Sequence, residues 1–117
     1  MVGIGGSATN DAGIGAASAL GWSFLDAQGK PVAPTGGRLK DIAALAGADQ
    51  PFESMEVLCD VTNPLYGPMG ASWVYGPQKG VVDFDFFESR LQKLADIARH
   101  NLGVDHRDVP GAGAAGG

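Results

Sequence analysis

The stretch Phe84–His100, which reads FDFFESRLQKLADIARH, holds the clearest secondary-structure signal in the chain. Its apolar side chains recur at alternating spacings of three and four residues, which places one set on a single helix face: Phe84, Phe87, Leu91, Leu94 and Ala98. Asp85 and Glu88 have the spacing of a capping box, with aspartate in the place of serine or threonine. Arg99 and His100 suit the negative end of a helix dipole. We therefore predict an amphipathic helix that closes just after His100.

Shorter patterns on the N-terminal side of this helix predict alternating strands and helices. The predicted strands are the end of one at Val2–Ile4, then Trp22–Leu25, a buried strand at Glu56–Val61 and a short strand at Ser72–Tyr75. The predicted helices are a buried one at Ala12–Leu20 and a short one at Leu39–Ala46, and Val32 is expected to begin a return strand after the turn Asp26–Pro31. This succession predicts a mixed α/β (α+β) fold.

Glycine is unusually frequent, with 19 residues in a chain of 117. There is no G-X-Y period, which excludes collagen, and 44% of the residues are hydrophobic while 18% are charged, which argues against disorder. Many glycines cluster near the two ends of the sequence, between Gly3 and Gly15 and between Gly111 and Gly117. The composition predicts a globular chain with glycine-rich loops at both ends.

The charge balance and the cysteine count limit the class of protein. A net charge of −5 and a pI near 4.7 argue against a nucleic-acid partner, which usually requires a basic face. The single cysteine, Cys59, cannot form an internal disulfide, and its apolar neighbours predict a buried free thiol. Apolar stretches are far shorter than a membrane span, and no secretory signal is visible, so we expect a cytoplasmic protein with no membrane partner.

Two glycine patterns resemble the dinucleotide-binding fingerprint. Gly3–Ala8 fits G-x-G-x-x-A, and Gly111–Gly116 fits G-x-G-x-x-G. Asp26 stands at the distance expected of the acid that binds the ribose. Against this interpretation, Asp11 would repel a pyrophosphate at the start of the following helix, and Asp26 is followed by turn residues.

Other polar residues have both a functional and a structural interpretation. Lys79 stands between two glycines, where it could meet a phosphate or lie in solvent. Asp60 and Asn63 lie at the end of a predicted strand, where ligands often bind, but they could equally form an Asx turn. His100 and His106 lack the spacing of a zinc site. The aromatic residues Trp22, Trp73 and Phe87 are expected in the core.

Several motifs occur together in one order: Gly5–Asp11 (GGSATND), Cys59–Leu65 (CDVTNPL), Gly70–Ser72 (GAS), Gly76–Gly80 (GPQKG) and Pro110–Gly117 (PGAGAAGG). In this combination the chain resembles the bacterial glycerate kinase family, the type that phosphorylates glycerate with ATP, over essentially its whole length. Members of that family have two α/β domains and are a few hundred residues long. The resemblance implies that this chain is a central portion, made mainly of the inserted second domain. Residues 1–21 would lead from the main domain, 22–109 would form the inserted α+β domain, and 110–117 would return to the main domain.

The resemblance further implies phosphoryl transfer from ATP to D-glycerate with Mg²⁺. Within that chemistry we assign Lys79 to charge neutralisation, and Asp11 and Asp60 to Mg²⁺ binding or to the base role. Further candidate contacts to substrate or phosphate are Gly5, Gly6, Ser7, Thr9, Asn10, Asn63, Gln78, Gly111 and Gly113. The expected partners are the two small substrates and the remaining N- and C-terminal parts of a parent chain, without which this piece is expected to be inactive. The alternatives are part of a dinucleotide-binding oxidoreductase or a non-catalytic ligand-binding module.

Overall fold

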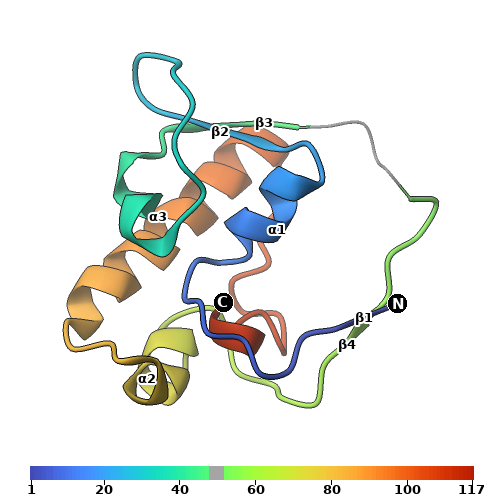
Figure 1. The fold of residues 1–117 in the computed structure, drawn as a ribbon, viewed down its shortest axis with the longest axis vertical. Helices are drawn as coiled ribbons and strands as arrows, with labels where there is room; N and C mark the ends of the chain where they lie inside the picture. The colour runs from blue at the N-terminus through green and yellow to red at the C-terminus, as the bar shows by residue number, and fades with distance from the viewer. Residues whose placement is uncertain (48–51) are drawn as a thin grey trace.

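Helix α3, Phe84–Leu102, is the longest element of the computed structural model, which describes residues 1–47 and 52–117. Its predicted apolar face is confirmed: Leu91 and Leu94 are buried, while Phe84, Phe87 and Ala98 are half-buried. The helix ends where Gly103 adopts a left-handed φ of 70°. Figure 1 shows α3 running beneath the strands of the upper half of the molecule.

The N-terminal cap of α3 differs from the prediction. The Oδ1 atom of Asp83 accepts a hydrogen bond from the Phe86 backbone N–H at 2.9 Å, so Asp83 is the cap and Asp85 lies in the first turn. Glu88 does not reach back to the cap. Its Oε2 atom instead accepts from the Gly67 N–H at 2.6 Å, which ties the loop before α2 to α3. A capping box centred on Asp85 and Glu88 is therefore wrong, because the helix starts one residue before Asp85.

An antiparallel pair of strands packs over α3. Strand β2, Ser23–Leu25, pairs with β3, Ala44–Ala46, with Phe24 opposite Leu45. The predicted helix at Leu39–Ala46 is wrong: a 3-10 helix, Gly36–Asp41, buries Leu39, and the chain then extends to give β2 a partner. The predicted return strand at Val32 is reduced to a single bridge between Leu25 and Pro31 and one hydrogen bond from the Val32 N–H to the Phe24 carbonyl. Pro31 has no N–H to donate, which limits further pairing.

One hydrophobic cluster joins these elements. It contains residues of α1 (Ile14–Ala19), β2, the 3-10 helix, α2 (Ala71–Tyr75) and α3. Its buried members are Ile14, Phe24, Val32, Leu39, Ile42, Ala71, Leu91 and Leu94. Helix α1 is shorter than predicted, because Ala12 and Gly13 hold left-handed φ values of 54° and 70° and the helix begins only after them.

Helix α2 replaces the strand predicted at Ser72–Tyr75. Ala71 and Ser72 are fully buried, whereas Trp73 is 46% exposed and stacks on Phe84 with ring centroids 4.6 Å apart. The prediction of Trp73 as a core residue is therefore wrong, while Trp22 packs against the core as expected. A segment of four residues is too short to distinguish a strand from a single helical turn.

A second, smaller sheet lies apart from the first, at the right of the view in Figure 1. Strand β1, Val2–Gly3, pairs in parallel with β4, Val57–Leu58. Within the part of the chain that the structure describes, β4 pairs with β1 alone, and Val57 and Leu58 are 45% and 55% exposed. The strand is thus neither as long nor as buried as predicted, and the Cys59 thiol is exposed rather than buried.

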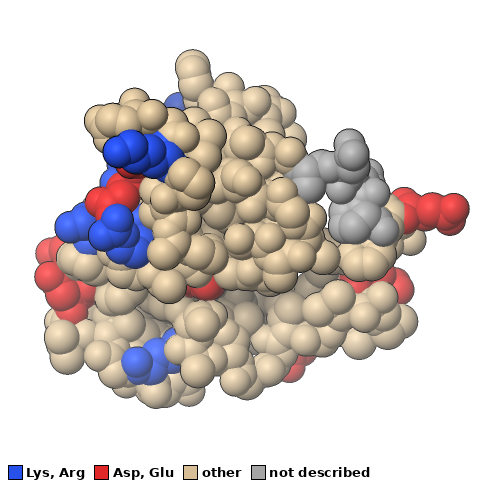
Figure 2. Space-filling view, turned by 45° about the horizontal axis from the view of Figure 1, so that its top comes forward, with Lys and Arg blue, Asp and Glu red and all other residues tan. Residues whose placement is uncertain are grey.

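Charges of both signs share the surface. Figure 2 shows Lys and Arg side chains beside Asp and Glu along one side, while most of that face is uncharged. Arg38, for example, pairs with Asp41 at 2.9 Å. In residues 1–47 and 52–117, the helices are too short or too polar to cross a membrane.

The cap assignment predicts a difference between two aspartates of the same helix end. Replacing Asp83→Ala should lower the free energy of unfolding by about 1 kcal/mol, because it removes the acceptor of an otherwise unpaired N–H. The matched variant Asp85→Ala loses only a charge near the helix dipole and should cost less than about 0.5 kcal/mol. Urea unfolding followed by circular dichroism measures both. A larger loss for Asp85→Ala would contradict the assignment.

Candidate functional site

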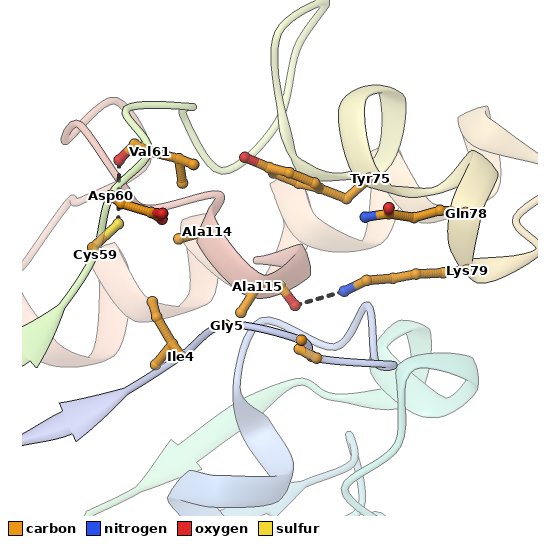
Figure 3. Close-up of a pocket in the computed structure, with 12 residues that line it drawn as sticks. Ile4, Gly5, Cys59, Asp60, Val61, Tyr75, Gln78, Lys79, Ala114 and Ala115 are labelled. Carbon is orange, nitrogen blue, oxygen red and sulfur yellow. Dashed lines mark hydrogen bonds between the residues drawn. The ribbon is translucent and has the colours of Figure 1, made fainter.

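Lys79 joins two loops that come from opposite ends of the chain. It ends the 3-10 helix Pro77–Lys79, which follows α2 directly. Its ammonium group donates hydrogen bonds to the carbonyl oxygen of Thr9 and to that of Ala115, and the second bond, at 2.6 Å, is drawn in Figure 3. Lys79 is therefore not a solvated loop lysine but the link between the Gly5–Asp11 loop and the C-terminal glycine-rich segment.

A cavity of about 200 Å³ opens beside the Lys79 ammonium. Several predicted site residues line it together: Gly5, Gly6, Ser7, Asp60, Gln78 and Lys79. In Figure 3 the Lys79 and Gln78 side chains extend from one wall, and the Asp60 side chain stands on the opposite wall. Cys59 and Tyr75 also line the cavity, although the sequence alone marked neither as a site residue.

A second cavity of about 280 Å³ also has Lys79 in its lining. It contains the predicted residues Thr9, Asn10 and Asp11. The segment Thr35–Gly37 also lines it. Sequence reasoning treated that segment only as a turn, because nothing local in Thr-Gly-Gly signals a partner so far along the chain.

Asp11 is a buried carboxylate next to Lys79. It is 8% exposed, and its Oδ1 atom accepts a hydrogen bond from the Gly13 N–H at 3.1 Å. Burial lowers the pKa of Lys79 below its ordinary value of 10.5, and the negative charge of Asp11 partly opposes that shift. The pair thus keeps a cation in a partly desolvated site.

The two predicted metal ligands do not meet in one cavity. Asp60 lines the cavity with Gly5 and Gly6, whereas Asp11 lines the cavity with Thr35 and a further cavity with Gly5 and Ser7. Across residues 1–47 and 52–117, no group of three or more His, Cys, Asp and Glu residues is arranged to hold a metal ion. Asp11 and Asp60 are therefore separate candidates for a metal ligand. A single carboxylate still suits Mg²⁺ that arrives on nucleotide phosphates, because Mg²⁺ is often held by one carboxylate and substrate oxygens.

The side chains of Asn10 and Asn63 both form hydrogen bonds to other residues of the protein. Asn63 donates to the Met69 carbonyl at 2.8 Å and accepts from the Tyr75 hydroxyl at 2.8 Å, so its amide positions the loop before α2. Asn10 donates to the Ser72 hydroxyl at 3.3 Å, and its Oδ1 atom is buried without a hydrogen-bond partner in the structure.

The predicted glycines divide into two kinds. A Cβ atom on Gly113 would overlap the Pro64 carbonyl, and one on Gly111 would lie 2.9 Å from the Cys59 sulfur, so close packing requires both glycines. A Cβ atom on Gly5 or Gly6 would meet no other atom within 4 Å. The space at Gly5 and Gly6 is therefore available to a ligand rather than filled by the protein.

The two glycine motifs and Asp26 do not have the geometry expected of a dinucleotide-binding site. Asp26 accepts hydrogen bonds from the Gln28 and Lys30 N–H groups, each at 2.9 Å, and so stabilises its own turn. The Gly111–Gly116 motif runs into the short 3-10 helix Ala114–Gly116 instead of an α-helix. Helix α1, which follows the Gly3–Ala8 motif, has six residues and is shorter than a usual pyrophosphate-binding helix.

Comparison with known proteins agrees with the resemblance seen in the motifs. The model of the glycerate kinase family matches residues 1–117. The chain is 46% identical to a glycerate kinase of Bacillus subtilis and 45% identical to a glycerate 2-kinase of Escherichia coli, with all of this chain covered in both cases. A solved structure described as glycerate kinase 2 from Salmonella typhimurium LT2 superposes with a TM-score of 0.91 at 45% identity, covering 97% of this chain. The chain spans about a third, 32%, of the length of each of these relatives.

The two kinds of glycine predict opposite effects on stability. Gly113→Ala should lower the free energy of unfolding by about 1–3 kcal/mol, because the new methyl group overpacks against the Pro64 carbonyl. Gly5→Ala, whose methyl group enters open space, should change it by less than about 1 kcal/mol. Urea unfolding of the two variants tests this, and equal losses would remove the distinction.

Proposed function

Because the chain belongs to the glycerate kinase family, we propose that it is part of an enzyme that transfers the γ-phosphoryl group of ATP to D-glycerate. The observation that carries the proposal is the position of the Lys79 ammonium, which lies between the open glycine loop and two adjoining cavities. Phosphoryl transfer depends mainly on positioning and on neutralising charge, and a fixed cation beside backbone N–H groups provides both.

The cavity at Gly5 and Gly6 suits the phosphates of the donor. No side chain fills the space next to these glycines, so a phosphate can approach their backbone N–H groups closely. The Ser7 hydroxyl and the Gln78 amide add neutral donors, and Lys79 supplies the charge. Mg²⁺ bound to the nucleotide would neutralise phosphate charge, and Asp60 is the carboxylate in this cavity that would hold it.

The cavity on the side of Thr35 suits the acceptor. Its volume of about 280 Å³ exceeds what a three-carbon hydroxy acid needs, and Lys79 provides a cation for the acid group. Asp11 lines the same cavity and carries a carboxylate that can accept the proton of the attacking hydroxyl. In this arrangement Asp60 serves the metal and Asp11 serves the acceptor, with Lys79 between them.

The complete site requires more protein than this chain. Its relatives are about three times as long, so we propose that the remaining parts of a parent chain complete the cleft. On this proposal residues 22–109 form the inserted domain, and residues 1–21 and 110–117 connect it to the main domain.

The proposal predicts activity for the full-length protein and none for the isolated segment. The full-length kinase should convert ATP and D-glycerate to ADP and phosphoglycerate in the presence of Mg²⁺, and it should show no saturable binding of NAD(P). The 117-residue chain alone should show no turnover, because it lacks part of the cleft. A coupled ADP assay with phosphoglycerate detection tests both. Turnover by the isolated chain, or tight NAD(P) binding by the full-length protein, would contradict the proposal.

The lowered pKa of Lys79 predicts the alkaline side of the pH profile. If the protonated amine is needed, kcat should fall as pH rises through the Lys79 pKa, and this should begin below the ordinary lysine value of 10.5. Lys79→Ala and Asp11→Asn should each lower kcat by about 10² or more in full-length enzyme. The residual activity of Lys79→Ala should lack the alkaline fall. An unchanged alkaline fall in that variant would show that another group titrates.

A further inference from the structure

We infer that Gly116 is a positioning residue for Lys79: the space left by its missing side chain is the seat of the Lys79 ammonium. The kinetic consequence rests on the proposed function, whereas the seat itself rests on the contacts of three segments. These are the Gly5–Asp11 loop, the 3-10 helix that ends at Lys79 and the 3-10 helix Ala114–Gly116.

The seat is defined by what a side chain at position 116 would meet. A Cβ atom there would overlap both the Lys79 Nζ atom and the Thr9 carbonyl oxygen, which are themselves hydrogen-bonded partners. The glycine is buried and holds a left-handed φ of 99°. Any larger residue at 116 must therefore displace the ammonium, the Thr9 carbonyl or both.

The neighbouring residue supplies the second carbonyl of the seat. Ala115 has a left-handed φ of 57°, an unfavourable conformation for a residue with a side chain. In the described ranges, Ala12 is the other non-glycine residue with a positive φ, and it directly follows Asp11. Strained backbone of this kind persists where the surroundings impose it, often at functional sites. Here the strain accompanies a carbonyl oxygen 2.6 Å from the Lys79 Nζ atom.

This seat fixes the direction of the cation. A lysine ammonium has three N–H donors, and the carbonyls of Thr9 and Ala115 take two of them. One donor remains for a ligand in the adjoining cavities. A lysine held in this way offers one directed hydrogen bond, whereas a free lysine would have to be ordered each time the ligand binds.

The test is a double-mutant cycle in the full-length kinase. Gly116→Ala should lower kcat by about tenfold or more, because small misplacements of a catalytic group are costly. In the Lys79→Met background the same Gly116→Ala change should lower kcat by less than about twofold, since the group it displaces is already gone. Equal losses in the two backgrounds would overturn the inference, because they would mean that Gly116 acts independently of Lys79.

Gly29→Ala is the matched control for backbone strain. Gly29 has a left-handed φ of 76°, and a Cβ atom there would meet nothing within 4 Å. Its kcat should stay within about twofold of wild type although it carries the same kind of strained alanine. A tenfold loss in Gly29→Ala would attribute the Gly116 effect to strain and overturn the inference.

A second variant keeps the inference testable if Gly116→Ala does not fold. Lys79→Arg keeps the charge but carries a larger planar head, which the seat cannot hold as it holds an ammonium. It should lose at least about tenfold in kcat with circular dichroism unchanged. Wild-type turnover by Lys79→Arg would overturn the inference.

The Lys79 pKa provides a readout that needs no activity. Asp11, Cys59, Asp60 and Tyr75 are the titratable groups that share these two cavities with Lys79. An NMR titration of the Lys79 13Cε signal, assigned by its loss in Lys79→Met, should give a pKa that rises in Gly116→Ala, because the displaced amine returns to solvent. An unchanged Lys79 pKa in Gly116→Ala would overturn the inference. A full-length wild type that fails to phosphorylate glycerate would instead refute the proposed function and leave this titration valid.

Discussion

The ammonium of Lys79 is shared by two backbone carbonyls that come from opposite ends of the chain, and the arrangement of the candidate site depends on this interaction. Thr9 belongs to the loop that follows β1, and Ala115 belongs to the last 3-10 helix. Among the described residues, no backbone hydrogen bond joins residues 5–11 to residues 110–117. The lysine brings the two together, and its partial desolvation is tolerated because both carbonyls and the nearby Asp11 charge compensate for lost water.

The hydrophobic core supports this interaction from one side. The buried face of α3 packs against the 3-10 helix Gly36–Asp41, β3 and α2, and α2 leads through Gly76 into the short helix that carries Lys79. Buried Ser72 in α2 accepts from Asn10, so the core also contacts the loop that carries Thr9 and Asp11. The site therefore lies on irregular segments, but each segment is anchored to a packed element. This is the arrangement expected when loops provide chemistry and regular elements provide rigidity.

Prediction from the sequence succeeded where one pattern was long enough to specify one structure. The face of α3 is such a case, because five apolar side chains at helical spacing have no comparable arrangement in a strand. Leu39–Ala46 and Ser72–Tyr75 are the opposite case. Their short apolar patterns fit either a helix or a strand. In the first segment, pairing with β2 makes Ala44–Ala46 a strand. In the second, a helix buries Ala71 and Ser72. Val57 and Leu58 were expected to be buried, yet burial depends on neighbours that local sequence does not name.

The sequence by itself determined the long amphipathic helix, the mixed fold class, the family and the loops that carry the candidate residues, because these depend on local spacing and on the order of motifs. Only the tertiary structure decided which of those residues lie together. It brought Lys79 against Thr9 and Ala115, assigned Asp11 and Asp60 to different cavities, and required glycine at 113 and 116 for packing while leaving Gly5 open. The physical reason is that close packing, desolvation and shared hydrogen bonds join residues far apart in the chain, and no local pattern encodes such distances.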